Sequence, residues 1–202
     1  MSDPRLSIVI PAYNEERRLG ATLDAVTTFL REQAWDWEVR VVDDGSADAT
    51  VAIAEAAARL EPRVVVQREP HRGKGGAVRA GLTSARGEFR FICDADLSMP
   101  VGEVARFLPP QSPAFDVAIG SREGRQARRI GEPAYRHLMG RLFNRGVQLL
   151  VLPGIEDSQC GFKMFTAGAV DAIFPRVTVD GWAFDVEVLA KRQDHALKIA
   201  AL

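Results

Sequence analysis

The chain has 202 residues, 47% of them hydrophobic and 26% charged, and its formal net charge is −1. These values are typical of a folded globular protein, so they exclude a disordered or collagen-like chain, and the near-neutral charge argues against a nucleic-acid partner. The length predicts one domain with a sizeable core. Its two cysteines, Cys93 and Cys160, are too few for a disulfide framework, so we expect reduced thiols in the core.

The sequence also bears on the compartment. It contains no apolar run of about 18 residues, so we expect no transmembrane helix. Residues 1–5 lack the basic and then apolar layout of a signal peptide, so we expect a cytoplasmic location.

Short β-branched runs and amphipathic stretches alternate through the first half of the chain. Asn14 is expected to cap the first helix, with Glu15 and Glu16 near its positive end. The alternation predicts an α/β fold with a mostly parallel central sheet and helices on both faces. The predicted strands cover residues 6–10 (closed by Pro11), 38–42, 63–67 and 88–93, and the predicted helices run from Asn14 onward, from Asp48 to about Leu60, and from Gly73 to Ala85.

The second half is less regular. Residues 116–119 predict a strand, and another begins within residues 196–199. Residues 134–152 carry apolar side chains at spacings of three and four, which predicts an amphipathic helix. Residues 120–145 hold seven arginines and only two acidic residues, a local charge of +5.

Polar clusters follow three of the predicted strands, at 13–15, 43–44 and 94–96. Ligands of parallel α/β sheets bind beyond the carboxyl ends of the strands, so we expect these clusters to meet at one site. The Tyr13 ring can pack a nucleobase, and Asp44 can accept hydrogen bonds from a base or ribose. Asp94 and Asp96 suit Mg2+ or Mn2+ beside a diphosphate. The structural alternatives are a plain helix start, an Asx turn and a capping turn.

The segment 71–76, His-Arg-Gly-Lys-Gly-Gly, fits neither the nucleotide-triphosphatase loop nor the dinucleotide fingerprint. A helix that opens on glycine beside Lys74 can receive an anion, and glycines that only allow close packing are an equal alternative.

Taken in order, the motifs resemble those of the inverting, nucleotide-sugar-dependent glycosyltransferases of family 2, which have the GT-A fold. The segments that carry the resemblance are 8–16, 41–46, 73–77, 94–96, 120–122 and 159–163. More narrowly, residues 73–76, 159–163 and 182–187 resemble the dolichyl- and polyprenyl-phosphate β-glucosyltransferases, and the polyprenyl-phosphate mannosyltransferases are next.

The resemblance implies a donor site and a metal. Asp94 and Asp96 would hold Mg2+ or Mn2+. Ser98 stands where related mannosyltransferases can place an amide, so we expect it to reach the metal only through water. The residues implied to bind the donor are Pro11, Ala12, Tyr13, Glu15, Val42, Asp44, Lys74, Asp94, Ala95 and Asp96.

The resemblance also implies catalytic and acceptor residues. Arg122 and Arg136 would hold phosphate oxygens through forked hydrogen bonds, for which a solvated basic surface is the alternative. Asp185 would serve as a base or orient a sugar hydroxyl, unless it is only a helix N-terminal carboxylate. A lipid phosphate is already ionised, so a strong base is dispensable. Contacts to the sugar or acceptor are implied for Ser121, Gln159 and Lys163.

These inferences predict one catalytic domain over residues 1–202, with a nucleotide-binding half, 1–100, and an acceptor half, 101–202. Family members usually continue beyond Leu202, so a truncated chain or an incomplete acceptor wall stays open. The expected partners are a nucleotide-sugar donor, a polyprenyl-phosphate acceptor and a membrane surface. We expect peripheral attachment at the inner face of the membrane through residues 134–152 and their arginines, although such a helix can instead pack on its own core.

The predicted reaction is inverting transfer of a hexose, glucose from UDP-glucose, to polyprenyl or dolichyl phosphate. The alternatives are a GDP-mannose-dependent polyprenyl-phosphate mannosyltransferase, transfer to a sugar hydroxyl, and a nucleotide-sugar-binding domain without turnover. A nucleotide-binding oxidoreductase is disfavoured because no glycine fingerprint follows Ile10.

Overall fold

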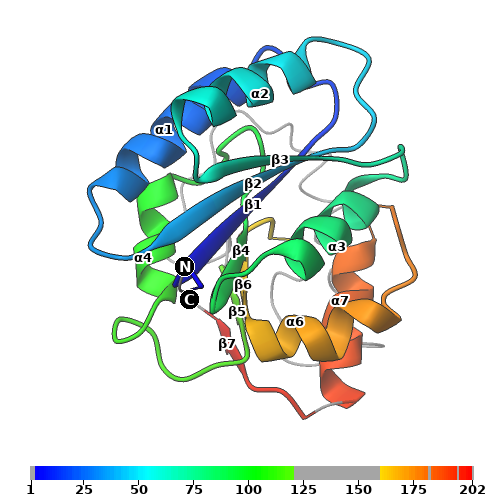
Figure 1. Ribbon diagram of the computed structural model, residues 1–202. Helices are drawn as coiled ribbons and strands as arrows, with labels where there is room; N and C mark the ends of the chain where they lie inside the picture. The colour runs from blue at the N-terminus through cyan, green and yellow to red at the C-terminus, as the bar shows by residue number, and fades with distance from the viewer. Residues whose placement is uncertain (1–2, 121–159, 182, 195, 202) are drawn as a thin grey trace, which may run out of the picture.

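A seven-stranded sheet lies at the centre of the computed structural model, which describes residues 3–120, 160–181, 183–194 and 196–201 (Figure 1). The strand order is β3-β2-β1-β4-β6-β5-β7, and β6 is antiparallel to both of its neighbours while the other pairs are parallel. The strands are β1 (Leu6–Ala12), β2 (Trp37–Asp43), β3 (Val64–Arg68), β4 (Phe89–Ile92), β5 (Val117–Ile119), β6 (Lys163–Thr166) and β7 (Ile199–Ala201).

Helices cover both faces of the sheet, which confirms the predicted α/β architecture. One face carries α1 (Leu19–Arg31), α2 (Thr50–Leu60) and α4 (Val104–Phe107), the last preceded by a 3-10 turn, η1 (Val101–Glu103). The other face carries α3 (Lys74–Ser84), α6 (Ala167–Ile173) and α7 (Phe184–Asp194), with a second 3-10 turn, η2 (Phe174–Arg176), after α6 (Figure 1).

Apolar side chains bury the two faces against these helices. On α1, the residues at helical spacing, Leu19, Leu23, Val26 and Leu30, are almost completely buried. Helix α3 lies very close to the sheet, because a Cβ on Gly81 would come within 2.4 Å of the Val9 side chain. Only a glycine permits that approach.

Strand β1 runs through Pro11, where the sequence predicted its end. The carbonyl of Val9 accepts a hydrogen bond from Cys93 N on the β4 side at 3.0 Å. Pro11 faces the same side, but β4 has already ended at Ile92, so no N–H is required there. The longer strand carries Ala12 and Tyr13 to the edge of the sheet.

The first helix begins at Leu19, so the prediction that Asn14 caps it was wrong. Asn14 has a left-handed backbone, with φ 54°, and its Oδ1 accepts a hydrogen bond from Ala47 N at 2.9 Å. Asparagine adopts this conformation at little cost. The hydroxyl of Ser46 accepts from Asn14 N at 2.9 Å, so the loop after β1 is fastened to the loop after β2.

Strand β6 and helix α6 were not predicted. Four residues, Lys163–Thr166, form β6 between β4 and β5, and the first three of them are buried. Thr166 then caps α6 by accepting a hydrogen bond from Ala169 N at 3.2 Å. The position of β6 matters for the site, because its antiparallel pairing with β4 places residues 160–162 at the carboxyl end of β4.

Among the helices in the described ranges, none combines the length and the apolar character needed to cross a bilayer.

Candidate functional site

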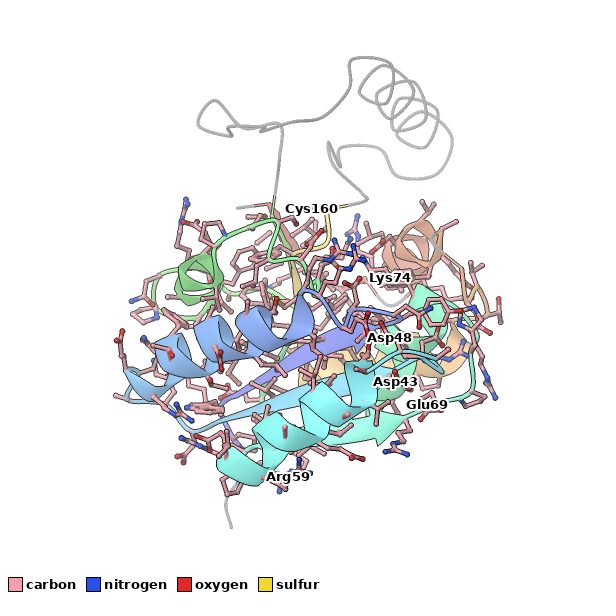
Figure 2. All side chains as sticks on the ribbon, turned by 90° about the horizontal axis from the view of Figure 1, so that it is seen from above. Asp43, Asp48, Arg59, Glu69, Lys74 and Cys160 are labelled. Carbon is pink, nitrogen blue, oxygen red and sulfur yellow. The ribbon has the colours of Figure 1, made fainter. Side chains whose placement is uncertain are left out.

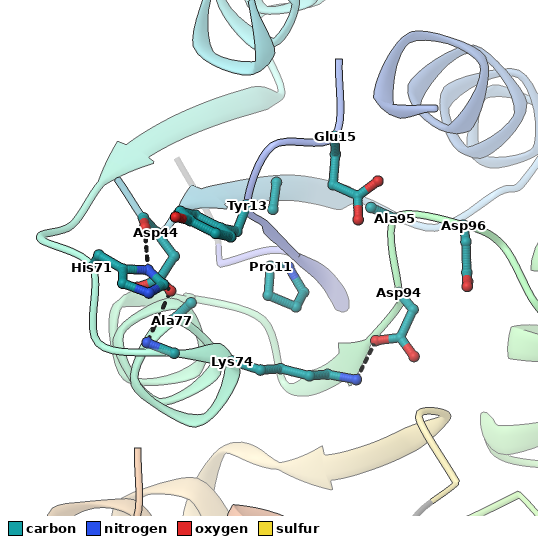
Figure 3. A pocket seen from close by; sticks show the side chains of 12 residues that line it. Pro11, Tyr13, Glu15, Asp44, His71, Lys74, Ala77, Asp94, Ala95 and Asp96 are labelled. Carbon is teal, nitrogen blue, oxygen red and sulfur yellow. Dashed lines mark hydrogen bonds and ion pairs between the residues drawn. The ribbon is translucent and has the colours of Figure 1, made fainter. Parts of the chain in front are cut away.

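A pocket of about 360 Å³ opens at the carboxyl ends of β1, β2 and β4 (Figure 3). Nine of the ten residues predicted to bind the donor line it. Val42 is the exception, because its side chain is buried and faces α3, where a Cβ on Gly81 would lie 2.7 Å from it. The pocket is lined by Pro11, Ala12, Tyr13, Glu15, Asp44, His71, Gly73, Lys74, Ala77, Asp94, Ala95 and Asp96.

One end of the pocket carries two stacked rings. The Tyr13 ring is 46% exposed and lies on the His71 imidazole, with centroids 4.2 Å apart and planes inclined by 24°. His71 Nδ1 lies 2.9 Å from Asp44 Oδ2. Tyr13 was predicted to lie here, whereas His71 was expected only to begin a glycine-rich segment. An exposed aromatic face suits a planar base.

Asp44 is buried beside these rings and organises the loop before α3. Its Oδ1 accepts a hydrogen bond from Arg72 N at 2.8 Å, and its Oδ2 accepts one from Gly73 N at 2.9 Å. The Asx turn considered in the sequence is formed by its neighbour, because Asp43 accepts from Gly45 N and Ser46 N. Gly45 has φ 76°, which favours glycine. Two adjacent aspartates therefore have separate tasks.

The first turn of α3 is closed by protein, so the prediction that its N-terminus receives an anion is not supported. The carbonyl of Asp180 accepts hydrogen bonds from Gly75 N at 2.8 Å and Gly76 N at 3.3 Å. A Cβ on Gly75 would lie 2.6 Å from the Cβ of Phe184. These glycines allow close packing, and Lys74 is the charged residue at this turn that lines the pocket, beside Gly73 and Ala77.

Lys74 and Asp94 form an ion pair across the pocket, with Nζ and Oδ1 2.6 Å apart (Figure 3). Their side chains are 37% and 25% exposed, so solvent reaches the pair. Behind Asp94 lies Gly161, where a Cβ would come within 2.2 Å of Asp94 Oδ2. Residue 161 must therefore be glycine for the carboxylate to keep this position.

Asp96 lies beyond Asp94 and is exposed. Its Oδ1 accepts a hydrogen bond from Ser98 N at 3.0 Å, so the contact here uses the backbone of Ser98. Between them Leu97 has φ 46°, a left-handed conformation that costs a non-glycine residue on the order of 1–2 kcal/mol. The tight turn presents both carboxylates to the pocket.

The pair of carboxylates fits a divalent cation that keeps other oxygen ligands. Within the described residues, no group of three or more His, Cys, Asp or Glu side chains has a metal-holding arrangement. Mg2+ typically takes one or two carboxylates and completes its shell with water and substrate phosphates. Asp94 and Asp96 are the residues that would hold such an ion.

Lys163 and Asp185 form a buried ion pair beneath this region. Lys163 Nζ lies 2.6 Å from Asp185 Oδ1 and donates to the carbonyl of Cys160 at 2.6 Å. The Lys163 side chain is 1% exposed, so the prediction that it touches sugar or acceptor is corrected: burial turns it inward. Asp185 lies in the first turn of α7, which agrees with the alternative that it is a helix N-terminal carboxylate. Its role as a base stays a prediction.

A sequence model described as Glycosyl transferase family 2 matches residues 7–174. The chain belongs to this family. It is 37% identical to the dolichyl-phosphate beta-glucosyltransferase of Homo sapiens, and the match covers 98% of this chain and 66% of that protein. It is also 37% identical to the dolichyl-phosphate beta-glucosyltransferase of Drosophila melanogaster, where the match covers 91% of this chain and 61% of that protein. The chain thus spans less than two thirds of the length of these relatives.

The fold of this family 2 chain is also that of solved glycosyltransferases. Glucosyl-3-phosphoglycerate synthase from Mycobacterium tuberculosis, crystallised with Mn2+, UDP-glucose and phosphoglyceric acid, matches with a TM-score of 0.67 and 19% identity. The match covers 98% of this chain and 69% of that one. The expected GT-A fold is confirmed.

Several residues predicted for this glycosyltransferase lie outside the described part of the chain. They are Ser121, Arg122, Arg136 and Gln159, together with the helix expected at 134–152 and its Arg141 and Arg145.

Both cysteines are buried thiols of the core, as predicted. Burial, with smaller contributions from the carboxylates of Asp94 and Asp96, raises the pKa of the Cys93 thiol to about 12. Cys93 is therefore a protonated thiol of the buried core.

Proposed function

We propose that this chain is the catalytic part of an inverting glycosyltransferase that moves glucose from UDP-glucose to a dolichyl or polyprenyl phosphate and uses Mg2+ or Mn2+. The observation that carries the proposal is one pocket that joins the exposed Tyr13 ring at one end to Asp94 and Asp96 at the other. A nucleoside diphosphate has the same order of parts, a flat base followed by a charged diphosphate.

The choice of sugar and acceptor is supported by the relatives. The human and fruit-fly proteins that match most of this chain are named for glucose transfer to dolichyl phosphate. UDP-glucose and Mn2+ are bound together in the mycobacterial synthase that shares the fold.

In the proposed reaction, a phosphate oxygen of the acceptor attacks the anomeric carbon as the bond from that carbon to the nucleoside diphosphate breaks. One displacement inverts the anomeric centre, and the ionised phosphate needs no general base. A bound divalent ion would neutralise charge on the departing diphosphate. Lys74 would pair with the diphosphate, and Arg122 and Arg136 would hold the incoming phosphate.

The two halves of the domain would divide the work. Among the described residues, those that line the pocket all belong to the half 1–100, so we assign the donor to this half. Residues 101–202 would bind the acceptor, and the stretch 134–152 would lie on the cytoplasmic surface of the membrane, where a lipid phosphate is presented.

The test is transfer of label into an organic phase. The chain is incubated with polyprenyl phosphate and radiolabelled UDP-glucose or GDP-mannose, with Mg2+, with Mn2+, or with a chelator, and lipid products are extracted. We expect label from UDP-glucose only when metal is present. Label from GDP-mannose alone would overturn the choice of sugar, transfer in chelator would overturn the metal, and nucleotide-sugar binding without product would indicate a binding domain.

A matched pair of variants shows whether the transfer belongs to this pocket. Asp96→Asn removes one carboxylate charge from the site. Arg59→Ala removes an exposed charge near the end of α2, well away from Lys74 and Cys160 (Figure 2). Loss of product with the first variant and full product with the second supports the assignment.

A further inference from the structure

The Lys74–Asp94 ion pair uses a carboxylate oxygen that the metal would also need. Asp94 has two oxygens, and Oδ2 faces the backbone of Gly161 so closely that a Cβ there would lie 2.2 Å away. Its Oδ1 is 2.6 Å from Lys74 Nζ. A divalent ion that binds Asp94 must therefore come close to the ammonium group or displace it.

Both groups are held by their backbones, while the lysine side chain keeps room to move. The Asp180 carbonyl fixes the first turn of α3, and the hydrogen bond from Leu97 N to the Asp94 carbonyl, 3.1 Å, fixes the acidic turn. The Lys74 side chain is 37% exposed. A diphosphate in the pocket would offer the Lys74 ammonium group another partner, one of higher charge than Asp94. Lysine is a common ligand of phosphates.

We infer that Lys74 makes metal binding and nucleotide binding depend on each other, by occupying Asp94 until a diphosphate takes the ammonium group. This inference rests on the proposed function. The nucleotide frees Asp94 for the metal, and the metal frees Lys74 for the nucleotide. Thermodynamic linkage requires the two effects to be equal, so each ligand raises the affinity of the other by the same factor.

A fixed ion pair that only orients Asp94 makes the opposite prediction. If Lys74 held the carboxylate in the geometry that the metal needs, its removal would weaken metal binding. If Lys74 competes for the carboxylate, its removal strengthens metal binding in the absence of nucleotide and weakens nucleotide binding in the absence of metal. The direction of one dissociation constant separates the two cases.

The experiment measures two dissociation constants on the full chain. Electron paramagnetic resonance of the free ion gives Mn2+ binding, with and without UDP. Calorimetry in the presence of a chelator gives UDP binding without metal. In Lys74→Met we expect Mn2+ alone to bind about three- to fivefold more tightly, in line with the strength of a partly exposed ion pair. UDP alone should bind about tenfold more weakly, and the gain in Mn2+ affinity on adding UDP should shrink.

The matched control is Arg72→Met, which removes a positive charge two residues earlier. Arg72 is exposed, and the contact recorded to a pocket carboxylate, Asp44, comes from its backbone N–H. We expect its Mn2+ affinity to stay within about twofold of the wild type, because exposed charges at a distance are screened.

Every outcome of this experiment either supports or contradicts the inference. Unchanged or weaker Mn2+ binding in Lys74→Met, or equal tightening in Arg72→Met, overturns the inference and leaves the proposed function standing. A wild-type chain that binds UDP but takes up no Mn2+ with or without it overturns the metal-dependent function, and the inference with it. Circular dichroism of both variants checks that they are folded.

Discussion

At the amino ends of β1 and β2, Glu38 is a buried carboxylate surrounded by donors, whereas at the carboxyl ends of β1 and β4, Asp94 and Asp96 face a pocket. Glu38 accepts hydrogen bonds from the Ser7 hydroxyl and from Arg86 N, both at 2.7 Å, and lies 3.6 Å from the Arg40 guanidinium. Asp96 is exposed, and the recorded hydrogen bond to its carboxylate comes from Ser98 N.

The same type of side chain thus serves stability at one edge of the sheet and ligand binding at the other. Burial alone would raise the pKa of Glu38, but the hydrogen bonds from Arg86 and Ser7 and the nearby guanidinium charges outweigh it and lower that pKa. A carboxylate with all its partners inside the protein has little left for a ligand.

Asp96→Ala should abolish metal-dependent binding of the donor and reduce transfer by about a thousandfold, equivalent to about 4 kcal/mol. The reason is the loss of one of the two carboxylates that would hold the ion. Calorimetry with UDP and Mn2+ measures the binding. Thermal unfolding should be unchanged, because the side chain is exposed. Unaltered donor binding would remove Asp96 from the site.

Glu38→Ala should lower the free energy of unfolding by about 3 kcal/mol, because it leaves the Ser7 hydroxyl, Arg86 N and two guanidinium groups without their buried acceptor. Urea denaturation measures the loss, and UDP affinity should not change. Glu103→Ala, which removes the 37% exposed partner of Arg106, is the control and should cost about 0.5 kcal/mol or less. Equal losses of unfolding free energy in Glu38→Ala and Glu103→Ala would contradict the stabilising role assigned to the buried carboxylate.

Glu61 supplies a pH-dependent test. The side-chain hydrogen bond from Arg63, joined by Arg31, lowers the pKa of Glu61 from 4.5 to about 2 although burial opposes the shift. A depressed pKa stabilises the fold above the unfolded value, and this contribution disappears as the pH falls from about 4.5 toward 2. Glu61→Gln should therefore cost about 1–2 kcal/mol at pH 7, allowing for the partly exposed arginines. Urea titrations of both proteins should converge near pH 2; a constant gap would refute the assignment.

His71→Ala should weaken UDP binding about threefold, because the Tyr13 ring loses the stacked partner that holds it toward the pocket. His71→Phe keeps a ring at this position and should recover most of the affinity. If both variants bind UDP like the wild type, the stack plays no part in the site.

The first half of the fold was largely predictable because its signals are local. The spacing of Leu19, Leu23, Val26 and Leu30 marks one helix face, and the runs around Val9 and Val41 mark buried strands. Strand ends of a parallel sheet share an edge, which is why the clusters at 13–15, 43–44 and 94–96 could be expected at one site from the sequence. The full set of donor residues, nine of which line the pocket, was implied by the resemblance to family 2.

The errors have long-range causes. Asn14 resembles a helix cap in sequence, but its side chain is taken by Ala47 on another loop. Strand β6 has four residues and is defined by its pairing with β4 and β5. Lys163 was expected to contact the sugar or acceptor, but its side chain is buried and forms an ion pair with Asp185, which is distant in the sequence. None of these partners can be read from neighbouring residues.

The hydrogen bonds to the Asp180 carbonyl have a mechanical consequence. A single main-chain oxygen ties the root of α3 to the turn before α7, and Glu187 on α7 in turn holds that turn through Thr178 N and Val179 N. The start of α3 therefore cannot tilt without breaking these hydrogen bonds or moving the 178–180 turn with it, so the backbone that carries Lys74 is positioned in part by α7.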